Sequence, residues 1–244
     1  MKTKILSLLI ALFILLGVGC TQLHDKSYSL IISEQFEPTA EDLASLVGAT
    51  YVNWRQAMLF WNSVVRVMEV SSDQSVIPGR PNGWVDGGVH RLVSEHQWST
   101  DHEVVNNCWN HLYAGVNNCN RVLYQIESGS IPVTEGKEET IAELKVLRAS
   151  YYYMLCDLYG NVPIMIKYDV PEGFIPEQST RQQVYDFIIK EVTDNIDLLS
   201  EQSGGLMYGR FNKWAAWTLL AKMYLNAEVY VNTAQWQQCI DACN

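Results

Sequence analysis

Residues 146–166 read VLRASYYYMLCDLYGNVPIMI and carry the clearest structural pattern in the chain. From about Lys137 to Tyr159, apolar and aromatic side chains recur every three or four residues, which is the spacing of one face of an α-helix; they are Leu144, Leu147, Tyr151, Leu155 and Leu158. Gly160 is a common helix-ending residue, and Pro163 follows it as a helix breaker. This segment therefore predicts a long helix and then a proline-containing connection to about residue 178.

Several large side chains on the predicted helices are expected in the core. Tyr151, Tyr152 and Tyr153 cover three successive helical directions, so at least one of them must face the protein interior. Cys156 lies in the same apolar stripe. Four tryptophans on other helical stripes are expected to pack likewise, namely Trp54, Trp61, Trp214 and Trp217.

Helical periodicity continues on both sides of this segment. It predicts helices at about 38–70 with one break, 101–127, 179–201 and 212–227, and one that begins at about 233. Residues 71–100 show no period and predict a long irregular loop, of a length that is usually functional or disordered. The candidates for strands are the short runs 30–32 and 162–166. The predicted fold class is therefore all-α.

Residues 154–160 (MLCDLYG) and 219–225 (LLAKMYL) are weakly similar at an offset of 65 residues. This offset is close to two helix pairs of about 34 residues each, which suggests tetratricopeptide-like stacking. The last predicted helix has only begun where the sequence ends, at Asn244. Either that helix packs back on earlier ones, or the chain is the front part of a longer protein.

The composition suits a folded protein that does not bind nucleic acid. Of the 244 residues, 48% are hydrophobic and 18% charged, which permits a packed core and excludes disorder of the whole chain. Asp and Glu number 27 against 17 Lys and Arg, so the net charge is -10. Binding to phosphates needs clustered Lys and Arg, and the sequence has no basic run. We therefore expect no nucleic-acid partner.

The first twenty residues, MKTKILSLLIALFILLGVGC, have the parts of a secretory signal peptide. Two lysines precede an apolar run at 5–16, which is too short to span a bilayer. Small residues then lead to Cys20 in a pattern that resembles a bacterial lipobox, with Gly17 where that pattern usually has Leu. We predict a signal peptide at 1–19, lipidation of Cys20 and a tether over 20–36. A plain secreted protein is the alternative.

The other cysteines and the histidines predict neither disulfides nor a metal centre. Cys108 and Cys119 lie eleven residues apart on one predicted helix, so about 16 Å separates them and they cannot pair. Four histidines lie near Cys108 in the sequence, but their spacings match no zinc pattern; they are His90, His96, His102 and His111. We expect no metal and no cofactor, while the carboxylates of the loop 71–100 leave calcium open.

Four segments resemble motifs of the SusD/RagB family of outer-membrane glycan-binding lipoproteins. Residues 146–166 resemble the family's R-a-x-x-Y-f-x-L-x-x-L-Y-G-d-V-P-L signature, with Asn161 where Asp is common. The other three segments agree in order and are CWNHLYAGVNNCNRVLYQIE (108–127), TRQQVYDFIIKEVTDNIDLLSE (180–201) and GRFNKWAAWTLLAKMYLNAEVY (209–230). The resemblance covers about 34–244. It implies a SusD-like amino-terminal helical domain at 37–244, with the carboxy-terminal half of the family absent.

The resemblance implies a function as well as a fold. It implies tetratricopeptide-like helix pairs and a lid-like subunit that sits on a SusC-like TonB-dependent transporter. Such a protein would be lipid-anchored at the outer-membrane surface of a Gram-negative bacterium and would bind an oligosaccharide or polysaccharide before import. Some family members bind other nutrients, so a peptide ligand stays open. A tetratricopeptide-like scaffold that binds only a protein is a further alternative.

The loop 71–100 is the predicted ligand-binding site. Saccharides have flat apolar faces that aromatic rings cover, and hydroxyl rims that Asp, Asn and Arg side chains can bind. The loop has this mixture, and the resemblance implies glycan contacts from it. We predict Trp84 as the stacking platform, and with it Asp73, Arg80, Asn82, Asp86 and Trp98. The alternatives are that both tryptophans only anchor the loop, and that Asp86-Gly87-Gly88 is only a turn.

We expect binding without catalysis. Glycoside hydrolysis needs two carboxylates that flank the scissile bond, one of them with a raised pKa. Asp73 and Asp86 are the pair that the loop offers, but nothing around them in the sequence supports that role. The sequence also lacks the G-x-S-x-G, phosphate-loop and zinc motifs of other enzyme classes.

Overall fold

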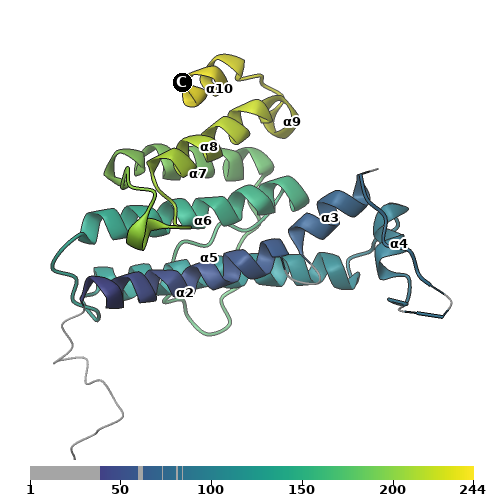
Figure 1. The fold of residues 1–244 in the computed structure, drawn as a ribbon, viewed down its shortest axis with the longest axis horizontal. Helices are drawn as coiled ribbons and strands as arrows, with labels where there is room; N and C mark the ends of the chain where they lie inside the picture. Colours follow the sequence, from purple (N-terminus) through teal and green to yellow (C-terminus); the bar gives the residue numbers. More distant parts are fainter. Residues whose placement is uncertain (1–38, 60–62, 73, 81, 84) are drawn as a thin grey trace, which may run out of the picture. The chain divides into compact units, whose positions relative to one another are not determined.

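The computed structural model describes residues 39–59, 63–72, 74–80, 82–83 and 85–244. They belong to one compact unit, Glu37–Asn244, built of helices and loops (Figure 1). The helices are α2 (Ala40–Leu59), α3 (Val64–Ser71), α4 (Val89–Ser94), α5 (Glu103–Glu127), α6 (Lys137–Tyr159), α7 (Arg181–Thr193), the short 3-10 helices η2 (Ile196–Leu198) and η3 (Gly205–Met207), α8 (Lys213–Leu225), α9 (Ala227–Val231) and α10 (Trp236–Cys243).

The helices stack in layers in the order of the chain. α2 lies beside α5, α6 lies on α5, α7 and α8 lie on α6, and α10 lies on α8 (Figure 1). Each amphipathic helix thus buries its apolar face between neighbours, which is how helix-pair repeats form a continuous core. The predicted all-α class and tetratricopeptide-like pairing are confirmed.

The tightest packing joins α5 to α6. Gly115 of α5 faces the ring of Tyr151, and a Cβ at Gly115 would lie at most 2.7 Å from three of its ring carbons. Tyr151 is fully buried, and its hydroxyl donates a 2.8 Å hydrogen bond to the carbonyl of Thr50 in α2. Tyr152 is also fully buried, whereas Tyr153 is half-buried. The core positions predicted from this helix, Cys156 included, are therefore confirmed.

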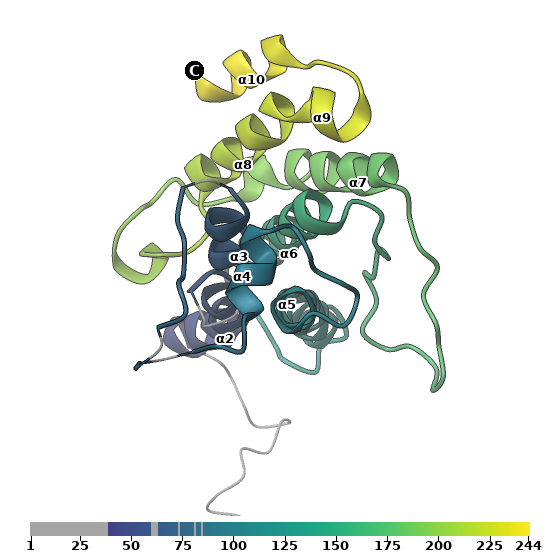
Figure 2. The ribbon, with the colours of Figure 1, turned by 90° about the vertical axis from the view of Figure 1, so that its right-hand side faces the viewer.

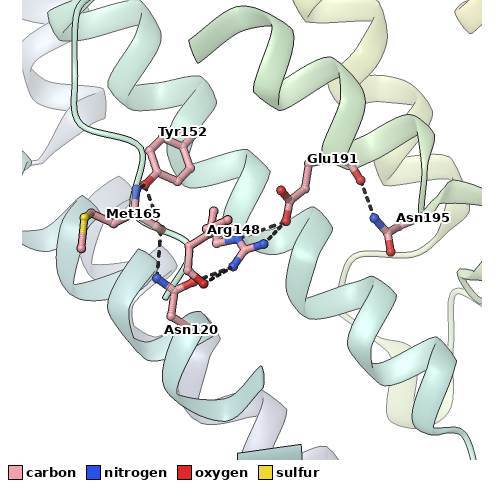
Figure 3. Close-up of polar contacts among 7 residues, drawn as sticks. Asn120, Arg148, Tyr152, Met165, Glu191 and Asn195 are labelled. Atoms are coloured by element: carbon pink, nitrogen blue, oxygen red, sulfur yellow. Dashed lines mark hydrogen bonds and ion pairs between the residues drawn. The ribbon is translucent and has the colours of Figure 1, made fainter. Parts of the chain in front are cut away.

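A buried polar network joins α5, α6, α7 and the connection that follows α6 (Figure 3). The guanidinium of Arg148 donates to Glu191 of α7, with the Nε–Oε1 distance at 3.0 Å, and to Oδ1 of Asn120 at 2.6 Å. Asn120 in turn donates from Nδ2 to the carbonyl of Met165 at 2.9 Å, and the amide of Met165 donates to the hydroxyl of Tyr152 at 2.6 Å. Burial raises the pKa of Glu191, although Arg148 opposes that shift.

A second buried network joins α2, α6 and the segment before α8. Glu143 of α6 is 1% exposed and pairs with the guanidinium of Arg210, whose Nε lies 2.8 Å from Oε1. The hydroxyl of Tyr51 in α2 donates to Glu143 at 2.7 Å and accepts from the amide of Phe211 at 2.7 Å. Every polar group of this cluster has a partner, as a buried ion pair requires.

The helix ends follow the local sequence, with one correction. Gly160 ends α6 with a φ of 74°, which favours glycine, and Thr180 and Gln183 form the predicted capping box at the start of α7. The prediction that α7 continues to about residue 201 is wrong. Asn195 donates from its side chain to the carbonyl of Glu191 at 2.7 Å, and this local bond competes with further helix.

Three other predictions need correction. The residues 71–100 contain the short helix α4 and are not wholly irregular. No strand occurs among the described residues, and the run 162–166 contributes only an isolated bridge from Pro163 to Gln178; the run 30–32 lies outside them. Trp214 is largely exposed rather than core, because its indole lies over the preceding segment and donates to the carbonyl of Glu201 at 3.1 Å.

The other tryptophans predicted in the core are Trp54, Trp61 and Trp217. Trp54 and Trp217 are partly buried against the core, while Trp61 lies outside the described residues.

The cysteines in the described ranges are free thiols, as the spacing predicted. In those ranges, no helix has both the length and the apolar character needed to cross a bilayer. The signal peptide at 1–19, the lipidated Cys20 and the tether over 20–36 lie outside them and stay predictions.

Candidate ligand-binding loop

The predicted ligand loop leaves α3, passes through α4 and enters α5 (Figure 2). α3 and α4 pack against each other, so the loop is held near both of its ends. Between them, the side chains of Arg80 and Asn82 are exposed to solvent. Two other predicted contacts, Asp73 and Trp84, lie outside the described residues.

Asp86 fastens the loop to the start of α4. Its Oδ1 accepts from the amide of Gly88 at 2.9 Å, and its Oδ2 accepts from the amide of His90 at 2.8 Å and from the imidazole Nδ1 of His90 at 2.6 Å. Burial alone would raise the pKa of Asp86, but these hydrogen bonds outweigh it and lower the pKa to about 2. The carboxylate is thus ionised and fully engaged within the chain. Asp86-Gly87-Gly88 thus forms the turn that the sequence offered as an alternative to a ligand contact. A ligand contact by Asp86 stays a prediction.

Two further histidines fasten the other end of the loop. His96 has a positive φ of 56°, and its Nε2 donates to the carbonyl of Ser71 at the end of α3, at 2.6 Å. His102, at the start of α5, donates from Nε2 to the carbonyl of Val89 in α4 at 3.1 Å. The spacing of these histidines in the sequence did not predict this role. The Asp86–His90 spacing of four residues, just before a helix, was the available signal.

Trp98 packs on the fastened part of the loop. Its ring centroid lies 5.4 Å from that of His96, and about half of its side chain is exposed. One face therefore stabilises His96 while the remaining surface is open to solvent. This geometry is compatible both with the anchoring alternative and with a ligand contact, so the predicted contact by Trp98 stays a prediction.

The described part of the loop offers polar groups that a ligand can contact. Arg80 and Asn82 offer hydrogen-bond donors and an amide acceptor to a hydroxyl-rich ligand. The lowered pKa of Asp86 differs from the raised pKa that a general acid of a glycoside hydrolase has. Within the described ranges, no three His, Cys, Asp or Glu side chains are grouped so that they could hold a metal ion.

The fold and the sequence both match known proteins. A family model described as "Starch-binding associating with outer membrane" matches residues 38–225. The chain belongs to the SusD-like family. A SusD-like protein of Bacteroides ovatus is 28% identical to it over 162 residues, which are 63% of this chain and 29% of that relative.

Solved structures agree with the family. A laminarin-binding SusD-like protein matches this SusD-like chain with a TM-score of 0.71 at 23% identity, over 85% of this chain and 43% of its own. The surface glycan-binding protein A from Bacteroides uniformis matches with a TM-score of 0.68 at 22% identity, over 84% of this chain and 45% of its own. The SusD-like chain thus spans less than half the length of these relatives.

Proposed function

We propose that this SusD-like chain binds a glycan at the cell surface, without chemical conversion, and delivers it to a SusC-like TonB-dependent transporter in the outer membrane. The observation that carries the proposal is the match of residues 38–225 to a family model described as starch-binding and associated with the outer membrane. Two structural relatives, a laminarin-binding SusD-like protein and a surface glycan-binding protein, support the same function.

The described geometry supports capture rather than turnover. The loop after α3 presents Arg80 and Asn82 to solvent, and Asp86, His90 and His96 hold its ends by hydrogen bonds inside the chain. A loop held in advance loses less conformational entropy when a ligand binds, which favours affinity. Trp84 is the stacking platform in this proposal, and Asp73 and Arg80 are the hydrogen-bonding groups.

The predicted amino terminus supplies the location. A lipid on Cys20 would hold the protein at the membrane surface, and two or more acyl chains give stable anchoring where one chain does not. Holding a glycan next to a transporter mouth raises its local concentration there. The function therefore needs affinity and proximity, and it needs no catalytic group.

Electrophoresis of the full chain without residues 1–19 through native gels that contain starch, laminarin or other polysaccharides tests the proposal. We expect retardation by at least one glycan, with no new reducing ends in a parallel assay. Trp84→Ala should weaken the retardation without unfolding the protein. Trp236→Ala, at a half-exposed tryptophan on α10, is the matched control and should leave it unchanged.

Each other outcome has a definite meaning. New reducing ends would refute a purely binding role. Normal retardation of Trp84→Ala would refute the stacking assignment while leaving glycan binding intact. If no glycan retards the chain, a peptide or another nutrient, or a protein partner alone, replaces the glycan as the ligand.

A further inference from the structure

A pocket of about 640 Å³ lies away from the ligand loop, between α5, α6, α7 and the connection after α6. Its volume is within the range of about 300–1,000 Å³ that is usual for small-molecule sites. It involves the carboxyl-terminal part of α5 from Asn120 onward, whereas the ligand loop joins α5 at Glu103. At 1.5 Å per residue, these two points are about 26 Å apart along the helix.

The floor of the pocket is the buried network of Asn120, Arg148 and Glu191 (Figure 3). This network also fixes one wall, because Asn120 binds the carbonyl of Met165 and Arg148 reaches the carbonyl of Ile166 at 3.4 Å. The next residues along the chain, Lys167 to Asp169, line the pocket. The wall is therefore set in place before any ligand arrives, as an efficient binding site requires.

Two tyrosines form an aromatic surface in the pocket. Tyr124 of α5 and Tyr168 of the connection lie with ring centroids 6.0 Å apart and ring planes inclined by 42°. The two residues are 43% and 40% exposed, so a ligand can reach both rings from solvent. Phe187 of α7 adds a third, less exposed ring to the lining.

The pocket lining has as many cationic as anionic side chains. Its lining has four cationic side chains, from Lys145, Arg148, Lys167 and Lys190. In a protein with a net charge of -10, this is a local concentration of positive charge.

Four carboxylates balance those cations in the lining, from Glu127, Asp169, Glu191 and Asp194. An anionic ligand would meet these carboxylates and a cationic ligand would meet the lysines, so like charges disfavour both. A hydroxyl both donates and accepts a hydrogen bond, and interspersed ammonium and carboxylate groups serve both functions.

We propose that this pocket is a second saccharide-binding site, which takes an uncharged sugar unit stacked on Tyr124 and Tyr168. The lysines and carboxylates that line the pocket bind its hydroxyls. The proposal rests on the saccharide-binding function proposed above, but it uses no residue of the ligand loop. The pocket is formed wholly by described residues of this chain.

Calorimetric titration of the full chain with maltoheptaose and with laminariheptaose tests the second site. In the Trp84→Ala background, where the loop site lacks its proposed stacking residue, Tyr124→Ala/Tyr168→Ala removes both rings of the pocket and should weaken binding of at least one of these oligosaccharides about tenfold. Tyr124→Phe/Tyr168→Phe should restore most of the affinity, because it restores both rings. Tyr208→Ala, at a tyrosine 84% exposed elsewhere, is the control for loss of a surface ring.

The second site and the loop site can fail separately. The second site is overturned if replacing both tyrosines in the Trp84→Ala background changes the affinity by less than twofold, and also if the wild-type protein binds neither heptasaccharide. The loop proposal survives either result if polysaccharide gels still retard the wild type and Trp84→Ala weakens that effect. Far-UV circular dichroism checks that the double variant is folded, which we expect because both tyrosines are partly exposed.

Discussion

Replacing Gly115 by alanine adds one methyl group at the tightest point between α5 and α6. The new Cβ would lie within 2.7 Å of three carbons of the Tyr151 ring, whereas carbon atoms in ordinary contact are about 3.5–4.0 Å apart. The ring cannot easily retreat, because Tyr151 is fully buried and its hydroxyl is bonded to the carbonyl of Thr50 in α2. We expect the substitution to destabilise the protein strongly.

The expected magnitude follows from two opposing contributions. Alanine is favoured over glycine inside a helix by about 1 kcal/mol. Overpacking of a core costs about 1–3 kcal/mol, occasionally more, and three ring carbons in contact place this site at the upper end. If the ring is displaced, the lost hydrogen bond to Thr50 adds about 1 kcal/mol. The net loss should be about 2–3 kcal/mol, which lowers the Tm of a chain of this size by about 4–12 °C.

Urea and thermal unfolding of the full chain measure this loss. Gly48→Ala is the matched control, because Gly48 is also inside a helix, α2, and a Cβ there would meet nothing within 4 Å. Gly48→Ala should therefore stabilise the protein by up to about 1 kcal/mol. If Gly115→Ala proves as stable as the wild type, the close approach of α5 and α6 at Tyr151 is wrong.

Two further substitutions test the buried charges. Arg148→Met leaves Glu191 buried without its partner and should cost about 3–5 kcal/mol at neutral pH. Because burial raises the pKa of Glu191, this loss of stability should shrink as the pH falls toward 4 and the carboxyl is protonated. A loss that does not depend on pH in urea unfolding would contradict the ion pair. Asp86→Asn should lower the Tm at pH 7. The pKa of Asp86 is lowered to about 2 in the folded protein, against about 3.9 in the unfolded chain. The Tm difference should therefore persist down to about pH 4 and disappear toward pH 2. An equal Tm at pH 7 would show that the carboxylate does not fasten the loop.

Periodicity predicted most of the fold because the long helices bury one continuous face. α6 matches its expected bounds, and the capping box that starts α7 was visible as Thr180 and Gln183. The errors lie where a local side-chain bond overrides the pattern. Asn195 ends α7 early by bonding to the carbonyl of Glu191, and Asp86 starts a helix of only six residues, too short to show a period.

The candidate sites were predicted less completely, since they depend on tertiary contacts. The mixture of aromatic and polar residues identified the ligand loop. The contacts of His96 and His102 join residues 25 and 13 positions apart, which no local pattern shows. The second pocket brings together Tyr124 and Tyr168, from a helix and from a connection 44 positions later. No local pattern joins such residues, so sequence reasoning missed the pocket.

The network around Tyr51 has a consequence for how the stack folds and opens. Stacked helix repeats usually touch only their neighbours, so their ends can unravel one unit at a time. Here the hydroxyl of Tyr51 connects α2 to Glu143 and to the amide of Phe211, 160 positions later, just before α8. Opening α2 therefore breaks contacts at the start of α8 as well, and we expect the helices from α2 to α8 to unfold together. α10, which packs on α8 and has no fully buried side chain, can open by itself.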